Sequence, residues 1–243
     1  PEGRRFKSCR PDQLMDKSIK LIIRIIIILG KYTFLGRGFL KRFLIKIIEF
    51  LTFKLGNDLN QPLFKTKIYD FFINFYSDKK TEMKIYFQRK ENKELNYIKK
   101  VIDRNTWFID IGSNIGLYSL NIASLNNKTN KINILSVEPH PIMLNRLKEN
   151  LNLLISQNTY VKKRFFIVGK AIGVNKKKGY LDISGNHANS RLTLDKRKKT
   201  IKVEVTDIND LIEKYKIKKI GCIKIDTEGS EFQILKSLFK KKK

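Results

Sequence analysis

The sequence predicts an α/β fold of the Rossmann-like kind, built on a parallel sheet. Short apolar runs typical of buried parallel strands occur at 107–111, 132–137, 165–168 and 222–225. Helical patterns follow three of these runs, at 117–125, at 141–155 and from about residue 230. Strands that alternate with helices favour right-handed crossovers, with the ligand site beyond the carboxyl ends of the strands.

Length and composition set the scale of this fold. The chain has 243 residues and a mass of 28.6 kDa, which gives room for one α/β domain and a modest extension. Hydrophobic residues make up 42% and charged residues 30%, so the chain can bury a core and is not disordered throughout. The two cysteines, Cys9 and Cys222, form no CxxC pair, which argues against a disulfide scaffold or a structural zinc site.

The chain carries a formal net charge of +28, with 51 Lys and Arg against 23 Asp and Glu. Such an excess is typical of proteins that bind nucleic acid or anionic membranes. Here 39 of the basic residues are lysines, and they are scattered rather than gathered into an arginine-rich stripe. This pattern favours a compositional bias, and we expect no specific nucleic-acid partner.

The amino-terminal part differs from the rest of the chain. Residues 1–14 hold three of the twelve arginines and two of the five prolines, and we interpret them as a read-through or otherwise non-native leader ahead of Met15. Within 15–56, the apolar run 21–29 is too short to span a bilayer, and 36–55 fits a basic amphipathic helix. This helix would either cap the main domain, 57–243, or attach to an anionic membrane surface. We expect a cytoplasmic protein, and in the second case it would also make peripheral contact with the inner membrane surface.

Several further elements are expected along the chain. Aromatic and β-branched residues at 64–76 predict a strand pair or one bent strand, and helices are expected at 81–87 and 92–103. A β-hairpin is expected between Gly179 and Val205, with 180–183 and 201–205 as its strands. Asp207 has the position of a helix N-cap.

Two strand ends carry the residues that indicate a cofactor. Asp110 ends the first strand, and Gly112 and Gly116 follow it four residues apart, which is not the GxGxxG pattern of dinucleotide-binding proteins. A carboxylate here would repel a pyrophosphate, whereas it would attract the ammonium and sulfonium of S-adenosylmethionine. Glu138 ends the next strand and is placed to accept hydrogen bonds from both ribose hydroxyls.

Four segments of the chain resemble, in order and spacing, the FkbM-type methyltransferase family: FIDIGSNIGLYSL, SVEPHPIMLNRLKENLNL, KAIGVNKKKGYLDIS and CIKIDTEGSEFQILK. The resemblance extends over roughly residues 64 to 240. It implies a class I methyltransferase fold, S-adenosylmethionine as cofactor, and O-methyl transfer to a hydroxyl of a sugar, glycolipid or polyketide. The expected partner is therefore a small-molecule or glycan acceptor.

The resemblance also implies roles for individual residues. The methionine end of the cofactor would be bound by the first strand end and its turn, with Asp110, Gly112, Ser113, Asn114 and Gly116. The second strand end, Glu138 with Pro139, would bind the ribose. Ala171 and Ile172 would meet the edge of the adenine.

An acidic block, Asp226, Glu228 and Glu231, follows the last strand. Methylation of a hydroxyl needs a base beside the acceptor oxygen, and Asp226 or Glu228 is expected to supply it. Glu231 is expected to cap the following helix or to bind the acceptor. His187 and Asn189, near the tip of the hairpin, are candidates for contact with the acceptor. The acids lack the further His or carboxylate ligands of a metal site, so we expect no metal.

The family resemblance also implies further strands beyond the four that the motifs supply. We therefore expect a domain that is truncated after its fourth core strand, in effect a fragment. Such a chain would bind its cofactor weakly and turn over poorly. The edge of the fourth strand would be exposed and prone to association.

Three other functions compete with this interpretation. A basic, nucleic-acid-modifying methyltransferase would suit the charge, but the sequence after the last strand is Asp226-Thr-Glu-Gly rather than an Asn/Asp-Pro-Pro-aromatic run. An NAD-dependent oxidoreductase is disfavoured by Asp110. A non-catalytic membrane-surface protein would leave Asp110, Glu138 and Asp226 without a purpose.

Removal of residues 1–14 should leave the melting temperature unchanged, because a non-native leader makes no packing contacts. Thermal unfolding of the full and shortened chains, followed by circular dichroism, checks this. A drop of several degrees would show that the leader belongs to the fold.

Overall fold

A computed structural model describes residues 64–68, 71–75, 92–173, 178–183, 191–193 and 199–239, and the single helical positions 22, 25, 43, 46, 47 and 50. The chain divides into two compact units, Pro1–Thr66 with Asn74–Lys90 and Lys67–Ile73 with Glu91–Lys243. The expected leader, the helix at 81–87 and, apart from those single positions, the basic helices of 15–56 lie outside the described residues. Within the described part of the chain, no helix combines the length and the apolar character needed to cross a membrane.

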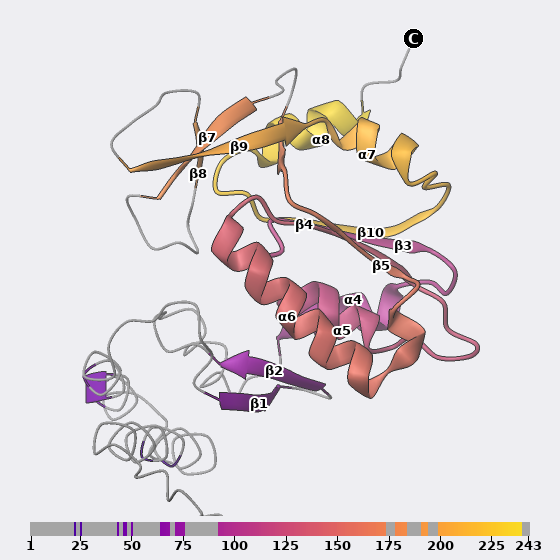
Figure 1. The fold of residues 1–243 in the computed structure, drawn as a ribbon. Helices are drawn as coiled ribbons and strands as arrows, with labels where there is room; N and C mark the ends of the chain where they lie inside the picture. The colour runs from indigo at the N-terminus through magenta and orange to yellow at the C-terminus, as the bar shows by residue number, and fades with distance from the viewer. Residues whose placement is uncertain are drawn as a thin grey trace, which may run out of the picture. The chain divides into compact units, whose positions relative to one another are not determined.

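The second unit is built on a four-stranded parallel sheet, as the sequence predicts (Figure 1). Its strands are β3 (Trp107–Ile111), β4 (Asn133–Val137), β5 (Phe165–Val168) and β10 (Ile220–Ile225). Their order in the sheet is β10-β3-β4-β5, and every neighbouring pair is parallel. The register aligns Ile225, Ile111, Val137 and Val168, so the four carboxyl ends meet at one edge.

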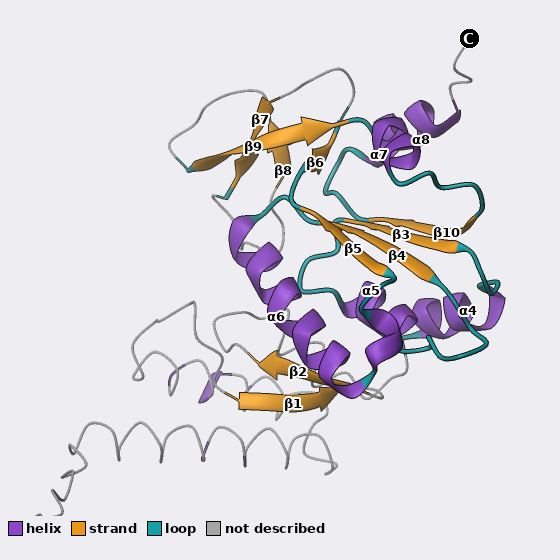
Figure 2. Cartoon of the chain, turned by 45° about the vertical axis from the view of Figure 1, so that its right-hand side comes forward, coloured by secondary structure: helices purple, strands orange, loops and turns teal. Residues whose placement is uncertain are grey.

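Helices cover both faces of this sheet (Figures 1 and 2). One face carries α4 (Lys93–Val101), α5 (Leu117–Ala123) and α6 (Pro141–Gln157), and the other carries α7 (Ile208–Lys214) and α8 (Glu231–Phe239). A single 3₁₀ turn, η2 (Thr159–Val161), follows α6. The predicted helices at 92–103, 117–125 and 141–155 are thereby confirmed in type and position.

Alternation along the strands decides which side chains meet which helices. Ile109 and Ile111 of β3 join a buried cluster with Ile208 of α7 and Ile234 of α8. The intervening Phe108 and Asp110 must face the opposite way, since successive strand residues point to opposite sides of a sheet. Both strand faces are therefore buried, as expected for a parallel sheet between two helical layers.

Short-range hydrogen bonds fix the helix starts. The Asn92 side chain accepts from the amide of Leu95 ahead of α4, and the Asp207 side chain accepts from that of Asn209 ahead of α7. The second contact confirms the predicted N-cap at Asp207. At α6, His140 is the N-cap and Pro141 takes the first helical position, which proline favours because it has no N–H to satisfy.

The expected hairpin is part of a larger second sheet (Figure 2). Strands β7 (Lys178–Asp182) and β9 (Thr200–Thr206) pair antiparallel, as predicted. However, β8 (Arg191–Thr193) pairs with β7, and β6 (Ala171–Ile172) pairs with β9, which gives the order β6-β9-β7-β8. A simple hairpin is therefore the wrong description. Strands of two or three residues are too short to show a period-two pattern, and only pairing with neighbours defines them.

The predicted strand pair at 64–76 is present as β1 (Phe64–Ile68) and β2 (Phe71–Phe75), which form a two-stranded sheet. In the main sheet, β10 and β5 are the two edges among the described residues. The expectation of further strands beyond residue 243 stays a prediction.

Candidate active site

The turn after β3 has a backbone that few residues can adopt. Gly112, Asn114 and Gly116 all have positive φ, at 75°, 53° and 91°. A Cβ on Gly112 would lie 1.9 Å from the carbonyl oxygen of Asp226, so glycine is required where β3 passes the end of β10. The amides of Gly112 and Ser113 both donate to the carbonyl of Val137, at 3.0 Å, which ties the turn to the end of β4.

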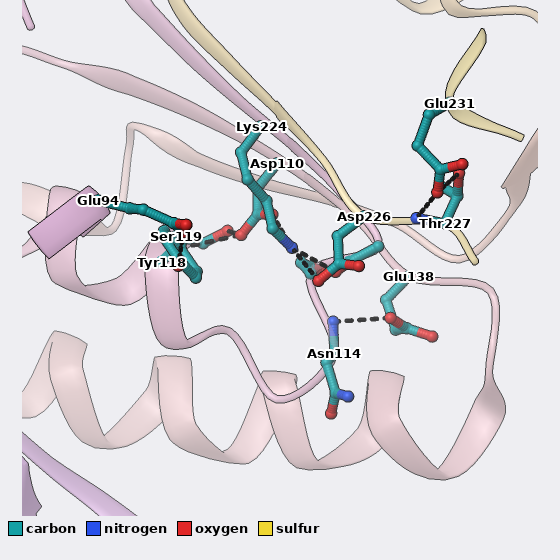
Figure 3. A network of polar contacts seen from close by, with 12 residues as sticks. Glu94, Asp110, Asn114, Tyr118, Ser119, Glu138, Lys224, Asp226, Thr227 and Glu231 are labelled. Carbon is teal, nitrogen blue, oxygen red and sulfur yellow. Dashed lines mark hydrogen bonds and ion pairs between the residues drawn. The ribbon is translucent and has the colours of Figure 1, made fainter. Parts of the chain in front are cut away.

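Glu138 joins the end of β4 to this turn (Figure 3). Its Oε2 accepts from the amide of Asn114 at 2.7 Å, and its Oε1 accepts from that of His140 at 2.8 Å. The residue is only 6% exposed. Burial raises the pKa of Glu138 to about 7, although the two amide hydrogen bonds act in the opposite direction.

Asp110 lies in β3, just before the turn, and is fully buried. Its Oδ2 accepts from the hydroxyl of Ser119 at 2.6 Å and from the Ser119 amide at 3.2 Å, and its Oδ1 forms an ion pair with Lys224 at 3.3 Å. The described partners of Asp110 are thus groups of the protein itself. Its predicted direct contact with the methionine end of a cofactor stays a prediction.

Lys224 lies between two carboxylates, as Figure 3 shows. Its Nζ is 3.3 Å from Asp110 and 3.5 Å from Oδ2 of Asp226, and it donates to the carbonyl of Gly112 at 2.9 Å. Burial by itself would lower the pKa of Lys224, but the two carboxylates outweigh it and raise the pKa above its ordinary value. The side chain therefore stays charged at neutral pH.

The acidic block after β10 divides into two kinds of carboxylate. Asp226 and Glu228 are exposed, and the Asp226 side chain is 65% accessible. Glu231 instead accepts from the amides of Thr227 and Gly229 and from the Thr227 hydroxyl, at 2.8–3.1 Å. Hydrogen bonds from Gly229 and its neighbours lower the pKa of Glu231 to about 2. This geometry favours the structural role of Glu231 as a cap of the turn before α8.

The other predicted site residues lie in different surroundings. Ser113 is buried and its hydroxyl donates to the Val137 carbonyl, while Pro139 is half-buried. Ala171 and Ile172 are buried in hydrophobic clusters and form β6, three residues after β5 ends. His187 and Asn189 lie outside the described residues. Within the described ranges, no group of three or more His, Cys, Asp or Glu residues is arranged to hold a metal ion.

The strand ends thus bring together a glycine turn, a buried glutamate and an exposed aspartate at one edge of a parallel sheet. The same stretch matches a known family profile, the methyltransferase FkbM domain, over residues 110–243. The chain belongs to the FkbM methyltransferase family. This membership confirms the resemblance seen in the four segments. The family is one of methyltransferases, which implies S-adenosylmethionine as the methyl donor of its members.

Individual relatives resemble the chain at low sequence identity. A hexuronic acid methyltransferase, AglP of Haloferax volcanii, is 26% identical over 129 residues, which are 53% of this chain and 48% of the relative. The chain thus matches about half the length of that protein. Among solved structures, the methyltransferase FkbM from Methylobacillus flagellatus has a TM-score of 0.36 and 17% identity, covering 66% of this chain and 40% of its own. A complex of aTrm5 with tRNALeu has a TM-score of 0.32 and 16% identity, covering 46% and 32%.

Sequence reasoning missed Lys224 and the residues around it. Tyr118 has its ring 5.3 Å from the Lys224 Nζ, and its hydroxyl donates to Glu94 at 2.8 Å and accepts from Asn92 at 2.9 Å. Burial raises the pKa of Tyr118 to about 12, so it remains a neutral donor. A lysine between two isoleucines, Ile223 and Ile225, in an otherwise apolar strand was the available signal.

Folding stability should depend on the ionisation of Glu138. Its pKa is about 7 in the folded protein against an ordinary value of 4.5, so between these values the folded state binds more protons than the unfolded chain. The contribution of Glu138 to the free energy of unfolding is therefore complete below about pH 4.5 and is lost as the pH rises through 7. Between these values the free energy of unfolding should fall by up to about 1.4 kcal/mol per pH unit. Urea unfolding at a series of pH values should show this slope in the wild type and not in Glu138→Gln. Parallel curves for the two proteins would contradict it.

Proposed function

We propose that this FkbM methyltransferase transfers a methyl group from S-adenosylmethionine to a hydroxyl of a sugar, glycolipid or polyketide-like acceptor. One observation carries the proposal: the aligned carboxyl ends of β3, β4 and β10 bring the Gly112 turn, Glu138 and Asp226 together. The name of the Haloferax relative, a hexuronic acid methyltransferase, supports a carbohydrate acceptor.

The residues present fit this cofactor in two respects. A carboxylate can accept about four hydrogen bonds, and the described contacts of Glu138 use one on each oxygen. Glu138 therefore retains acceptor capacity for the two ribose hydroxyls, in a buried position where such hydrogen bonds are strong. Asp226 adds an exposed negative charge beside the turn, which would attract a sulfonium.

When bound, S-adenosylmethionine supplies a methyl group on a positively charged sulfur. The turn from Gly112 to Gly116 would hold the methionine end and Glu138 the ribose, while Ala171 and Ile172, whose side chains are packed inside, would meet the adenine through their backbone. Asp110 would act through Lys224, which donates to the Gly112 carbonyl of the turn.

Asp226 is our candidate for the base. Its carboxylate is exposed and directly follows β10. It forms an ion pair with Lys224, the lysine that also donates to the Gly112 carbonyl. As the acceptor oxygen forms its bond to the methyl carbon and the carbon–sulfur bond breaks, the hydroxyl proton would pass to Asp226. Glu228 is the alternative base, and His187 and Asn189 remain candidates for acceptor contact. Glu231 already accepts four hydrogen bonds from the turn, which is about the capacity of a carboxylate.

Loss of the Glu138 carboxylate should weaken cofactor binding. In Glu138→Ala two ribose hydroxyls lose their acceptor, which costs on the order of 1–3 kcal/mol. Titration calorimetry with S-adenosylmethionine measures this, and NAD serves as the control ligand. Unchanged affinity in the variant, or tighter binding of NAD by the wild type, would overturn the cofactor assignment.

Loss of the Asp226 carboxylate should abolish most methyl transfer without abolishing cofactor binding. General-base catalysis contributes roughly 10²–10⁴-fold, so Asp226→Asn should be slower by about that factor. The assay is transfer of labelled methyl from S-adenosylmethionine to a panel of hexuronic acid glycosides. Asp103→Asn is the matched control, because Asp103 is an exposed partner of a lysine, Lys219, at the opposite end of β10. If Glu228→Gln loses methyl transfer and Asp226→Asn keeps it, Glu228 is the base instead.

A further inference from the structure

A row of polar side chains crosses the main sheet one residue before its carboxyl edge. The parallel register pairs Lys224 of β10 with Asp110 of β3, and Asp110 with Ser136 of β4. Paired residues of neighbouring strands point to the same side of a sheet, so the three side chains share the face covered by α5. Ser119 of α5 completes the row, with its hydroxyl 2.6 Å from Asp110 and 2.9 Å from the Ser136 hydroxyl.

Lys224 is the member of this row that reaches the surface. An ammonium has three N–H donors, and three oxygens surround this one: the Gly112 carbonyl at 2.9 Å, Asp110 at 3.3 Å and Asp226 at 3.5 Å. The ring of Tyr118 covers another side of the ammonium, with its centroid 5.3 Å from the nitrogen. The lysine side chain is 16% exposed, whereas that of Asp226 is 65% exposed. Lys224 thus links a buried carboxylate to an exposed one.

We propose that Lys224 is a positioning residue for the reaction, which fixes the candidate base Asp226 and the cofactor turn relative to each other. This inference rests on the proposed function. Asp226 begins a loop, and its described side-chain contact is the ion pair with Lys224. The carbonyl of Gly112 belongs to a different strand end, so the same ammonium holds groups from β3 and β10. Asp110, whose Oδ1 is 3.3 Å from the ammonium, adds an ion pair from inside the sheet.

The test compares the wild type with Lys224→Met, which keeps the chain length but removes the charge and the donors, and with Lys224→Arg, which keeps the charge. Lys219→Met is the matched control, because Lys219 forms an exposed ion pair with Asp103 at the other end of the strand. Titration calorimetry with S-adenosylmethionine gives the affinity. Hydrogen exchange of the cofactor-free proteins gives the local mobility of peptides over 110–118 and 165–173.

In Lys224→Met we expect about tenfold weaker binding of S-adenosylmethionine and faster exchange over 110–118, with unchanged exchange over 165–173. Lys224→Arg should recover part of the affinity, and Lys219→Met should match the wild type. A change of less than threefold in Lys224→Met overturns the proposal. Weaker binding with faster exchange in both peptides also overturns it, because Lys224 would then serve the fold as a whole.

Lys224→Met leaves Asp110 buried without its cation, and this could prevent folding. The double variant Asp110→Asn/Lys224→Met removes both charges and should fold. Because Asp110 is itself a candidate cofactor residue, the reference is Asp110→Asn alone, and the double variant should bind S-adenosylmethionine about tenfold more weakly than that single variant. Equal affinity of the two overturns the proposal. Wild-type affinity in the double variant, or failure of both Lys224→Met and the double variant to fold, also overturns it. If the wild type itself does not bind S-adenosylmethionine, the proposed function fails, while the exchange comparison still tests whether Lys224 holds the turn.

Discussion

The carboxylate of Asp110 is fully buried near the carboxyl edge of the main sheet, and the arrangement of the site depends on how this charge is compensated. An ion pair that is broken inside a protein typically costs about 3–5 kcal/mol, because one charge remains without a partner. The structure meets this constraint with a hydroxyl and an amide from Ser119 and with the ammonium of Lys224. The Asp110 carboxylate therefore holds three elements together: the end of β3, the start of α5 and the end of β10.

The lysine that compensates Asp110 also contacts the residues to which we assign the chemistry of the site. Lys224 also contacts the Gly112 carbonyl and Asp226, so the buried charge and the exposed one share a cation. Glu138 makes a parallel link, from the end of β4 to the amide of Asn114. The turn is thus held from β4 and from β10, and a methyl donor bound there would lie between a ribose-binding carboxylate and a candidate base.

The strands, helices and glycine turn of the main sheet were predictable, because buried parallel strands are continuous apolar runs and the helices between them have regular apolar spacing. The second sheet was predicted only in part, since β6 and β8 are defined by pairing with β9 and β7. Asp110, Glu138 and Asp226 were found as acidic residues at strand ends. The contact of Asp110 with Lys224 depends on a neighbour distant in sequence, and the use of Glu231 to cap a turn depends on backbone conformation.

By itself, the sequence determined the family, the parallel α/β architecture and the acidic residues at the ends of three strands, because motif spacing and apolar periodicity are local properties of the chain. Only the tertiary structure decided that Lys224, Asp110 and Ser136 form one row, since the strand order β10-β3-β4 places the last strand in sequence beside the first of this sheet. A lysine and an aspartate 114 positions apart have no shared local pattern. Their contact follows from parallel register, which a linear sequence does not display.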